Sequence, residues 1–343
     1  MSRILIVAIA LTPGPACRVS RARESARVVE RARVSMGSEL RLTAWTSTEA
    51  SAVTAFEAVF AKFDRLESLM SVWREGSDVV RLNAAAGDHP VPVSVETREV
   101  LNAAREVSDW TDGKFDVTFG ALSDLWKFDH DQDNSIPDPA AVRARLPLID
   151  YRFVEVDDRA GTAFVTRRGA RVHLGGIGKG YAIDRAIALL RSKGLTDFMI
   201  QAGGDLYVSG RKGDRPWRLG IADPRGASAG SFATIELSNS TLTTSGDYER
   251  FFLEDGRRYH HLLDPDTGMP ATRCRSVTII THSALLADGL STGVFILGPQ
   301  EGMALIERLE NVEGVIVTST NDVLISSGLK GRLEGLHPPT DAP

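Results

Sequence analysis

Residues 174–180 read Leu174-Gly175-Gly176-Ile177-Gly178-Lys179-Gly180. Four glycines in seven residues allow the backbone to turn sharply and its amide groups to point inward. The segment before this stretch is expected to be a strand, and residues 181–193 have the apolar spacing of a helix, with Gly194 where a helix commonly ends. The stretch therefore predicts a tight connection between a sheet and a packed helix.

The surrounding chain alternates in the same way between strand and helix patterns. Apolar spacing predicts helices over residues 49–70, 94–111, 283–296 and 301–309. Alternation predicts strands over residues 36–46, 198–201, 217–222, 232–237, 276–280, 315–317 and 323–325, and a hairpin formed by 151–156 and 163–167. Runs of strands broken by a few helices predict an α+β fold, with mixed or antiparallel sheets and packed helices.

The charge is unevenly distributed over the 343 residues. Residues 1–35 contain seven arginines and two glutamates, so their net charge is +5. Because the whole chain has a net charge of −5, residues 36–343 carry −10. An acidic body lacks the basic surface that duplex binding needs, so nucleic acid is not expected as a partner. Residues 36–335 are expected to form the folded domain, and residues 336–343 a tail.

The amino end has features of an export signal. Arg3 precedes an apolar run from Ile4 to Leu11, and Cys17 follows Pro13, Gly14 and Pro15. The run is too short for a spanning helix, which needs about 20 residues, and it predicts either a short signal, with a possible lipid anchor at Cys17, or a structureless end. Residues 1–35 are expected to be this segment and a basic tether. The amino-terminal segment therefore predicts that the protein is exported, and is either periplasmic or anchored to the membrane outside the cytoplasm.

Lys179 is the first candidate for binding chemistry. A glycine-rich turn at a helix N-terminus, with a lysine beside it, favours a phosphate or pyrophosphate. The spacing matches neither the dinucleotide fingerprint nor the P-loop, because no Ser or Thr follows Lys179. The alternative is a tight turn with an exposed lysine.

Asp288 and Thr292 are four residues apart and share one face of a predicted helix. A carboxylate and a hydroxyl are hard oxygen ligands suited to Mg²⁺. The alternative is a surface carboxylate beside a threonine that bonds back to its own helix.

Asp247, His260, His261 and Asp264 form a third candidate group. A histidine beside a turn rich in Asp and Gly can act as a general base. If His260 and His261 lie on a strand, one of them must point away from a site, so at most one is expected to be catalytic. The alternative is a hairpin with partly buried histidines.

The Asp129–Asn134 segment resembles a calcium loop, but Asn134 and Ala140 replace the required Gly and Glu, which predicts an acidic solvated loop.

These segments, in this order, resemble the FAD:protein FMN transferase family, the ApbE-like flavin transferases. The resemblance runs from Met36 to Asn321 and rests on Met36-Gly37, Met70-Ser71-Val72-Trp73, Arg81-Leu82-Asn83, Asp112 to Thr118, Leu174 to Tyr181, Gly203-Gly204-Asp205, Thr244 to Tyr248, His261 to Gly268, Ala287-Asp288 and Ser291-Thr292. It implies an ApbE-like architecture and a monomeric or weakly associating enzyme. Such an enzyme binds FAD with Mg²⁺ and transfers FMN to a threonine of an acceptor subunit of a membrane electron-transport complex, releasing AMP.

The resemblance also implies roles for individual residues. His261 would be the base, and Mg²⁺ would be held by Gly176, Asp288 and Thr292. The FAD-binding residues would be Met36, Trp73, Lys114, Phe115, Asp116, His173, Lys179 and Leu263. His173 stands where the family usually has Asp, so nucleotide affinity or specificity is expected to differ. Two alternatives remain open: an FAD pyrophosphatase giving FMN and AMP, and a non-catalytic flavin-binding protein.

Overall fold

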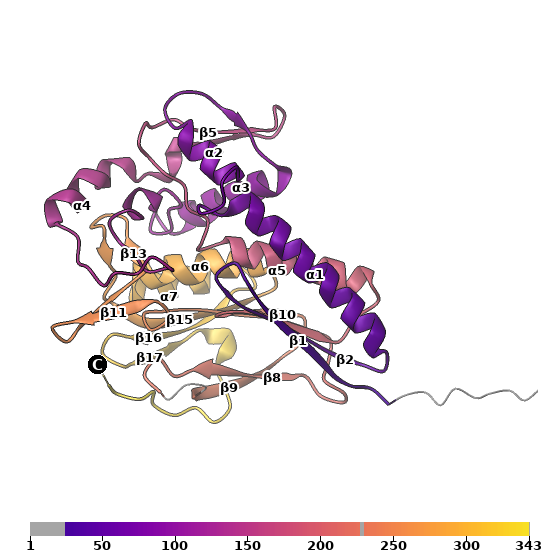
Figure 1. Ribbon diagram of the computed structural model, residues 1–343. Helices are drawn as coiled ribbons and strands as arrows, with labels where there is room; N and C mark the ends of the chain where they lie inside the picture. The colour runs from indigo at the N-terminus through magenta and orange to yellow at the C-terminus, as the bar shows by residue number, and fades with distance from the viewer. Residues whose placement is uncertain (1–24, 227–229, 343) are drawn as a thin grey trace, which may run out of the picture.

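The computed structural model describes residues 25–226 and 230–342 (Figure 1). An eight-stranded sheet forms its centre, in the order β1-β2-β6-β7-β10-β15-β16-β17. Every pairing in this sheet is antiparallel, which confirms the expected α+β fold. Its strands are β1 Arg27–Ser35, β2 Ser38–Thr46, β6 Phe198–Ala202, β7 Asp205–Ser209, β10 Ser240–Gly246, β15 Cys274–Thr281, β16 Glu313–Thr318 and β17 Val323–Ile325.

Helices cover one face of the central sheet, as Figure 1 shows. They are α1 Glu49–Met70, α5 Gly178–Ser192, α6 Ala284–Leu297 and α7 Pro299–Arg308. The apolar spacing of α1 places Phe56 and Phe63 fully in the core between helices and sheet. Burying each such side chain contributes roughly 1.5–3 kcal/mol. Gly194, with φ +81°, lies just beyond the end of α5, as predicted.

A two-stranded sheet, β8 Trp217–Ala222 and β9 Ser231–Leu237, covers part of the opposite face. Its apolar side chains form a second core with β10, β15 and β16, in which Phe232 and Ile221 are buried against Val317. The central sheet is therefore packed on both faces.

A smaller region beside α1, α5 and α6 completes the fold (Figure 1). It contains helices α2 Asp78–Ala84, α3 Val95–Trp110 and α4 Pro139–Arg145, and the sheet β3 Val91–Pro92, β5 Thr162–Val165 and β4 Val154–Asp157. The hairpins β11 Phe251–Glu254 with β12 Arg257–His260, and β13 Leu263–Asp264 with β14 Met269–Pro270, lie next to it. Trp126, Phe128, Phe252 and Tyr259 form stacked aromatic contacts between this region and β11–β12.

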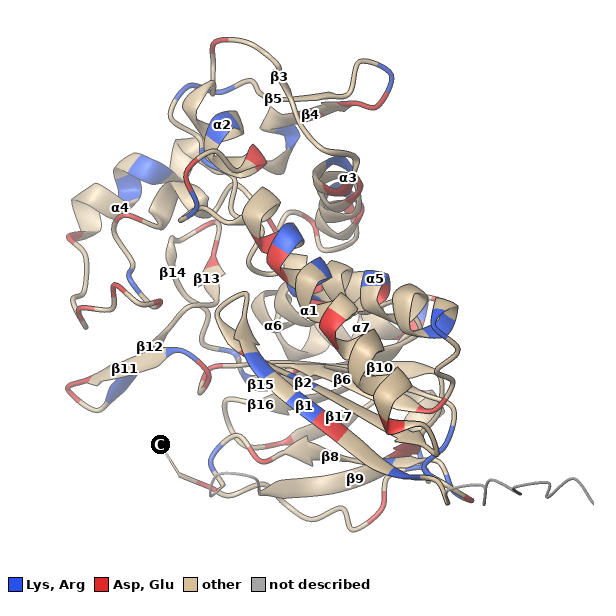
Figure 2. Cartoon of the chain, turned by 45° about the vertical axis from the view of Figure 1, so that its right-hand side comes forward, with Lys and Arg blue, Asp and Glu red and all other residues tan. Residues whose placement is uncertain are grey.

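The expectation of a basic tether up to residue 35 was wrong. Residues 27–35 form β1 and pair with β2. Figure 2 shows charged residues of both signs along β1 and α1. The guanidinium of Arg27 lies 2.6 Å from the carboxylate of Glu49, and that of Arg33 lies 3.2 Å from that of Glu57. The strand predicted from residue 36 begins at Ser38 instead, because Met36 and Gly37 have φ of 48° and 72° and make the turn.

The structure describes residues 336–342, which were expected to form a tail, but not residues 1–24. Residues expected to form a tail contact the body: the amide of His337 donates to the carbonyl of Phe232, and the amide of Thr340 donates to the carboxylate of Asp223. The predicted signal and Cys17 lie outside the described residues. Within residues 25–226 and 230–342, none of the helices has the length and apolar character needed to cross a bilayer.

Candidate active site

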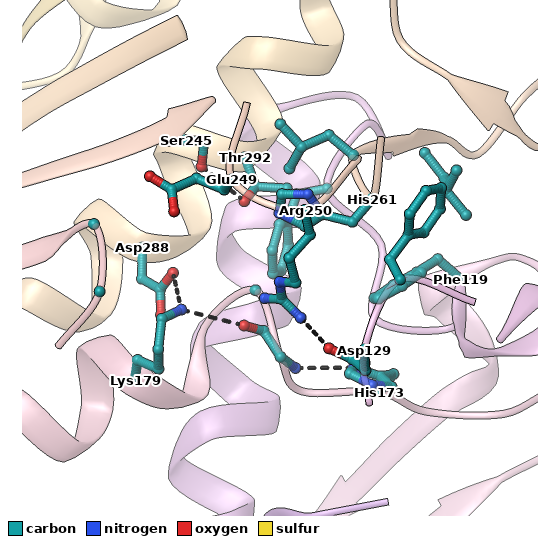
Figure 3. Close-up of a pocket in the computed structure, with 18 of the residues that line it drawn as sticks. Phe119, Asp129, His173, Lys179, Ser245, Glu249, Arg250, His261, Asp288 and Thr292 are labelled. Carbon is teal, nitrogen blue, oxygen red and sulfur yellow. Dashed lines mark hydrogen bonds and ion pairs between the residues drawn. The ribbon is translucent and has the colours of Figure 1, made fainter. Parts of the chain in front are cut away.

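A pocket opens between α5, α6, the β12–β13 connection and the smaller region (Figure 3). The site residues that the family resemblance implies all line it except Met36: Trp73, Lys114, Phe115, Asp116, His173, Gly176, Lys179, His261, Leu263, Asp288 and Thr292. Met36 lies behind it, 3.7 Å from the position that a β-carbon at Gly178 would occupy. Segments from the whole chain are therefore brought together around one pocket.

Lys179, in the first turn of α5, is held between two buried carboxylates. Its Nζ lies 3.0 Å from Oδ2 of Asp205 and 3.5 Å from Oδ1 of Asp288. Burial opposes the charged lysine, but the two carboxylates outweigh it and raise the pKa of Lys179. Burial and the charge of Asp205 also raise the pKa of Asp288, to about 6. The alternative of an exposed turn lysine is wrong, because only 16% of the Lys179 side chain is accessible.

The side chains of Asp288 and Thr292 lie one helical turn apart and both line the pocket (Figure 3). The Thr292 hydroxyl lies 3.7 Å from where a β-carbon at Gly176 would stand, and 3.3 Å from the hydroxyl of Ser245. No group of three or more His, Cys, Asp or Glu residues suited to a metal ion occurs in the described part of the chain. A metal here would instead need carboxylate, hydroxyl and carbonyl oxygens together, a set that fits Mg²⁺. Burial and then the charge of Asp205 raise the pKa of Asp288, and a bound cation would favour its charged form.

His261 lies between β12 and β13, and its backbone amide donates to the carbonyl of Arg250 at 3.2 Å. Its Nδ1 is buried and has no hydrogen-bond partner within residues 25–226 and 230–342. Burial, and then the positive charge of Arg250, lower the pKa of His261 well below its usual value. The imidazole is therefore neutral and able to accept a proton.

The neighbouring histidine has a different environment. His260 Nε2 lies 2.8 Å from the carbonyl oxygen of Ala271, and the amide of Leu262 donates to its Nδ1 at 3.3 Å. Both ring nitrogens are thus engaged, and the ring lies edge-on to Phe295. His261 therefore lines the pocket, and His260 does not.

Asp247 and Asp264 are occupied by basic partners. Asp247 makes two hydrogen bonds with the guanidinium of Arg225, of 2.6 and 2.8 Å, and does not line the pocket. Asp264 accepts from Nζ of Lys114 at 2.8 Å, and Asp266 accepts from the same nitrogen at 2.7 Å. These contacts hold the loop beside His261 in place.

The turn after α3 brings Lys114, Phe115 and Asp116 to the pocket. The amide of Gly113 donates to the carbonyl of Ser108 at 2.9 Å, so the turn also caps the helix. Burial raises the pKa of Asp116 to about 6, although hydrogen bonds from Thr118 and Tyr151 oppose the shift. The residue is therefore a buried acid that is fixed by its neighbours.

His173 and Trp73 lie at the edges of the pocket. The amide of Gly175 donates to His173 Nδ1 at 3.1 Å, and burial lowers the pKa of His173 to about 4, so the imidazole is neutral. Half of the Trp73 surface, 51%, is accessible. Its ring lies 4.4 Å from that of His130, so it forms part of the rim.

Several pocket residues were not predicted as site residues. Arg250 and Glu249 directly follow the Thr244–Tyr248 motif, and Asp205 ends the Gly203-Gly204-Asp205 motif. Their position next to or within these motifs was the feature of the sequence that could have identified them as site residues. Asp129, from the predicted acidic loop, forms an ion pair with Arg250 across the pocket (Figure 3). No spacing rule in the sequence connects these two residues, which are 121 positions apart.

The chain is similar to curated proteins over most of its length. The model of the ApbE family matches residues 36–316. An FAD:protein FMN transferase of Klebsiella pneumoniae (strain 342) is 33% identical over 311 residues, which cover 90% of this chain and 95% of the relative. One of Treponema pallidum (strain Nichols) is 32% identical over 340 residues, 93% of each chain.

Solved structures agree with this match. A crystal structure of the ApbE protein of Thermotoga maritima superposes with a TM-score of 0.82 at 33% identity, over 89% of this chain and 99% of the other. The flavin transferase ApbE of Vibrio cholerae gives a TM-score of 0.80 at 28% identity, over the same shares. The chain therefore belongs to the ApbE family, the FAD:protein FMN transferases.

Proposed function

We propose that this FAD:protein FMN transferase requires Mg²⁺, that its acceptor group is a threonine hydroxyl, and that it releases AMP. The observation that carries the proposal is that Lys179 of α5, Asp288 and Thr292 of α6, and His261 between β12 and β13 line one pocket. The threonine oxygen forms a bond to the phosphorus of the FMN half of FAD, and the bond from that phosphorus to the AMP oxygen breaks. The threonine proton passes to a base, and AMP leaves with the electron pair.

His261 is the base in this proposal. A neutral, partly buried imidazole whose Nδ1 has no hydrogen-bond partner among the described residues can accept the proton of a threonine hydroxyl that approaches it. The charge near the leaving oxygen is balanced by Lys179, which the paired carboxylates keep protonated. Positioning and charge neutralisation are the main demands of attack on a diphosphate.

The proposed Mg²⁺ ligands are the carboxylate of Asp288, the hydroxyl of Thr292 and the carbonyl of Gly176. When bound, the ion would neutralise charge on the diphosphate oxygens and hold them for attack. The carboxylate of Asp288 is fixed for this task by the amide of Gly180, which donates to Oδ2 at 2.9 Å.

The remaining pocket residues are proposed to bind the rest of FAD. Trp73 offers an accessible ring for stacking on an aromatic part of the ligand. Phe115, Asp116 and Leu263 form walls, and the neutral imidazole of His173 offers a hydrogen bond from Nε2, because its Nδ1 already accepts one. Met36, outside the pocket lining, supports the start of α5.

We further propose that the acceptor is a subunit of a membrane electron-transport complex and that the chain acts outside the cytoplasm. The support is the family resemblance for the acceptor and the Arg3–Cys17 segment for the location. Labelling of the chain with radioactive palmitate in its native host, compared with a Cys17→Ser variant, would test the anchor.

Mass spectrometry of an acceptor protein tests the proposed reaction. After incubation with FAD and Mg²⁺, the acceptor is expected to gain the mass of FMN less water on a threonine, with an equal amount of AMP released. His261→Ala should keep FAD affinity and slow transfer by about a hundredfold or more. His89→Ala, which changes an exposed imidazole, serves as the control. AMP and free FMN without a labelled acceptor would identify a pyrophosphatase, and unchanged FAD would identify a binding protein.

A further inference from the structure

The pocket has an excess of negative charge. In the part of the chain that the structure describes, six carboxylates and three basic side chains line it. A diphosphate that enters carries further negative charge, and like charges repel strongly where water is partly excluded. A single divalent ion near Asp288 would balance only part of this excess, so basic side chains of the chain must also contribute.

Two of the three basic side chains already form ion pairs with carboxylates. Lys179 lies between Asp205 and Asp288, at 3.0 and 3.5 Å. Lys114 lies between Asp264 and Asp266, at 2.8 and 2.7 Å. Each ammonium group therefore already faces two carboxylates, so a diphosphate would have to share its charge with them.

Arg250 differs from both lysines. Its ion-pair partner in the described structure is Asp129, and the two side chains are 42% and 32% accessible. An ion pair this exposed to water contributes little to stability, so its replacement costs little. A guanidinium binds phosphate through two parallel hydrogen bonds, a geometry that a lysine cannot provide.

Arg250 also lies beside the proposed base. Its carbonyl accepts the amide hydrogen bond of His261 at 3.2 Å, and its charge is one of the causes that lower the pKa of His261. Figure 3 shows its side chain reaching into the pocket between His261 and Asp129. A phosphate bound by this guanidinium would thus lie on the same side of the pocket as the imidazole.

We propose that Arg250 binds the diphosphate of FAD, and that Asp129 is the carboxylate it leaves when the ligand enters. This inference rests on the proposed function and adds to it a binding residue and a resting partner. The exchange forms and breaks no covalent bond. It replaces one carboxylate by phosphate oxygens on the same guanidinium.

The two residues are then expected to affect FAD affinity in opposite directions. Arg250→Gln should weaken FAD binding by about tenfold or more, since hydrogen bonds to charged groups are lost, and Arg250→Lys should restore it only in part. Asp129→Asn should strengthen binding about two- to fivefold, because the competing partner is removed. A purely structural ion pair would instead make both substitutions weaken binding alike.

The experiment is a titration of the full chain with FAD at fixed Mg²⁺, followed by flavin fluorescence. Asp131→Asn, which removes another pocket carboxylate of the same loop, measures the general effect of charge. Lys127→Gln, which removes a loop cation outside the pocket lining, is the second control and should leave affinity unchanged. Circular dichroism checks that each variant is folded.

The double variant decides the origin of the Asp129 effect. The gain from Asp129→Asn should exceed that from Asp131→Asn and should disappear in the Arg250→Gln background. Equal FAD affinity of Arg250→Gln and the unaltered chain would overturn the inference, as would weaker binding by Asp129→Asn. Absence of FAD binding by the unaltered chain would instead reject the proposed function itself.

Discussion

The backbone amide of Gly180 donates a hydrogen bond of 2.9 Å to Oδ2 of Asp288, and this contact fixes α5 against α6 at the pocket. Such an approach requires glycine. A β-carbon at position 180 would overlap the carbonyl oxygen of Ala284 and lie 2.8 Å from Cβ of Asp288. The glycine-rich stretch thus serves the packing of two helices as much as the turn that precedes them.

Gly180→Ala is therefore expected to lower the free energy of unfolding by about 1–3 kcal/mol, as overpacking of a filled site does. Guanidinium denaturation followed by circular dichroism measures the change. Gly178→Ala is the matched control in the same turn, because its β-carbon would meet only Cε of Met36, at an ordinary 3.7 Å. Equal losses in the two variants would contradict this account of the helix contact.

Asp288→Asn should remove the response of the transfer rate to Mg²⁺. The substitution keeps the shape of the side chain but removes the one carboxylate among the proposed ligands. We expect the rate at millimolar Mg²⁺ to fall by about a hundredfold or more, in line with the loss of a strong electrostatic contribution. Initial rates across a Mg²⁺ titration test this. A normal saturation curve in the variant would remove Asp288 from the metal site.

The pH dependence of transfer follows from the burial of His261. An ordinary histidine, with a pKa near 6.5, loses its base form as the pH falls through that value. Burial and Arg250 lower the pKa of His261, so its neutral base form persists at lower pH. At saturating Mg²⁺ and FAD, kcat should therefore change by less than about 1.2-fold between pH 7.5 and 6.5, whereas a base with a pKa of 6.5 would lose about 45% of its activity. A loss of half the activity near pH 6.5 would contradict the lowered pKa, and the profile of kcat against pH provides the measurement.

The elements that were predicted well are those whose apolar pattern alone determines their burial. Helix α1 is the clearest example: it spans Glu49–Met70, the range predicted, because large apolar side chains recur there at helical spacing and are buried. Strand β1 was missed because it lies at a sheet edge, where only Val29 and Ser35 are buried. Strand β10 was missed because its buried residues include Thr241 and Thr243, which do not mark a strand by hydrophobicity.

The pocket residues were predicted from motifs, but their interactions were not. Asp205 and Asp288 lie on either side of Lys179, although 83 residues separate the two carboxylates in the sequence. The ion pair of Arg250 with Asp129 likewise depends on the packing of β11 against the 129–134 segment. Contacts between distant segments are set by tertiary packing, so a local sequence pattern does not predict them.

The buried ion pair of Asp247 and Arg225 gives the last prediction. Their side chains are only 9% and 8% accessible, so Asp247→Asn would leave the Arg225 guanidinium buried without its carboxylate. Breaking a buried pair on one side costs about 3–5 kcal/mol, whereas an exposed pair contributes about 0–1 kcal/mol. The control is Glu334→Gln, which removes the carboxylate beside Arg218 at 3.4 Å, where both side chains are more than half accessible. Guanidinium unfolding curves should show a much larger loss for Asp247→Asn, and similar losses would mean that water reaches the buried guanidinium.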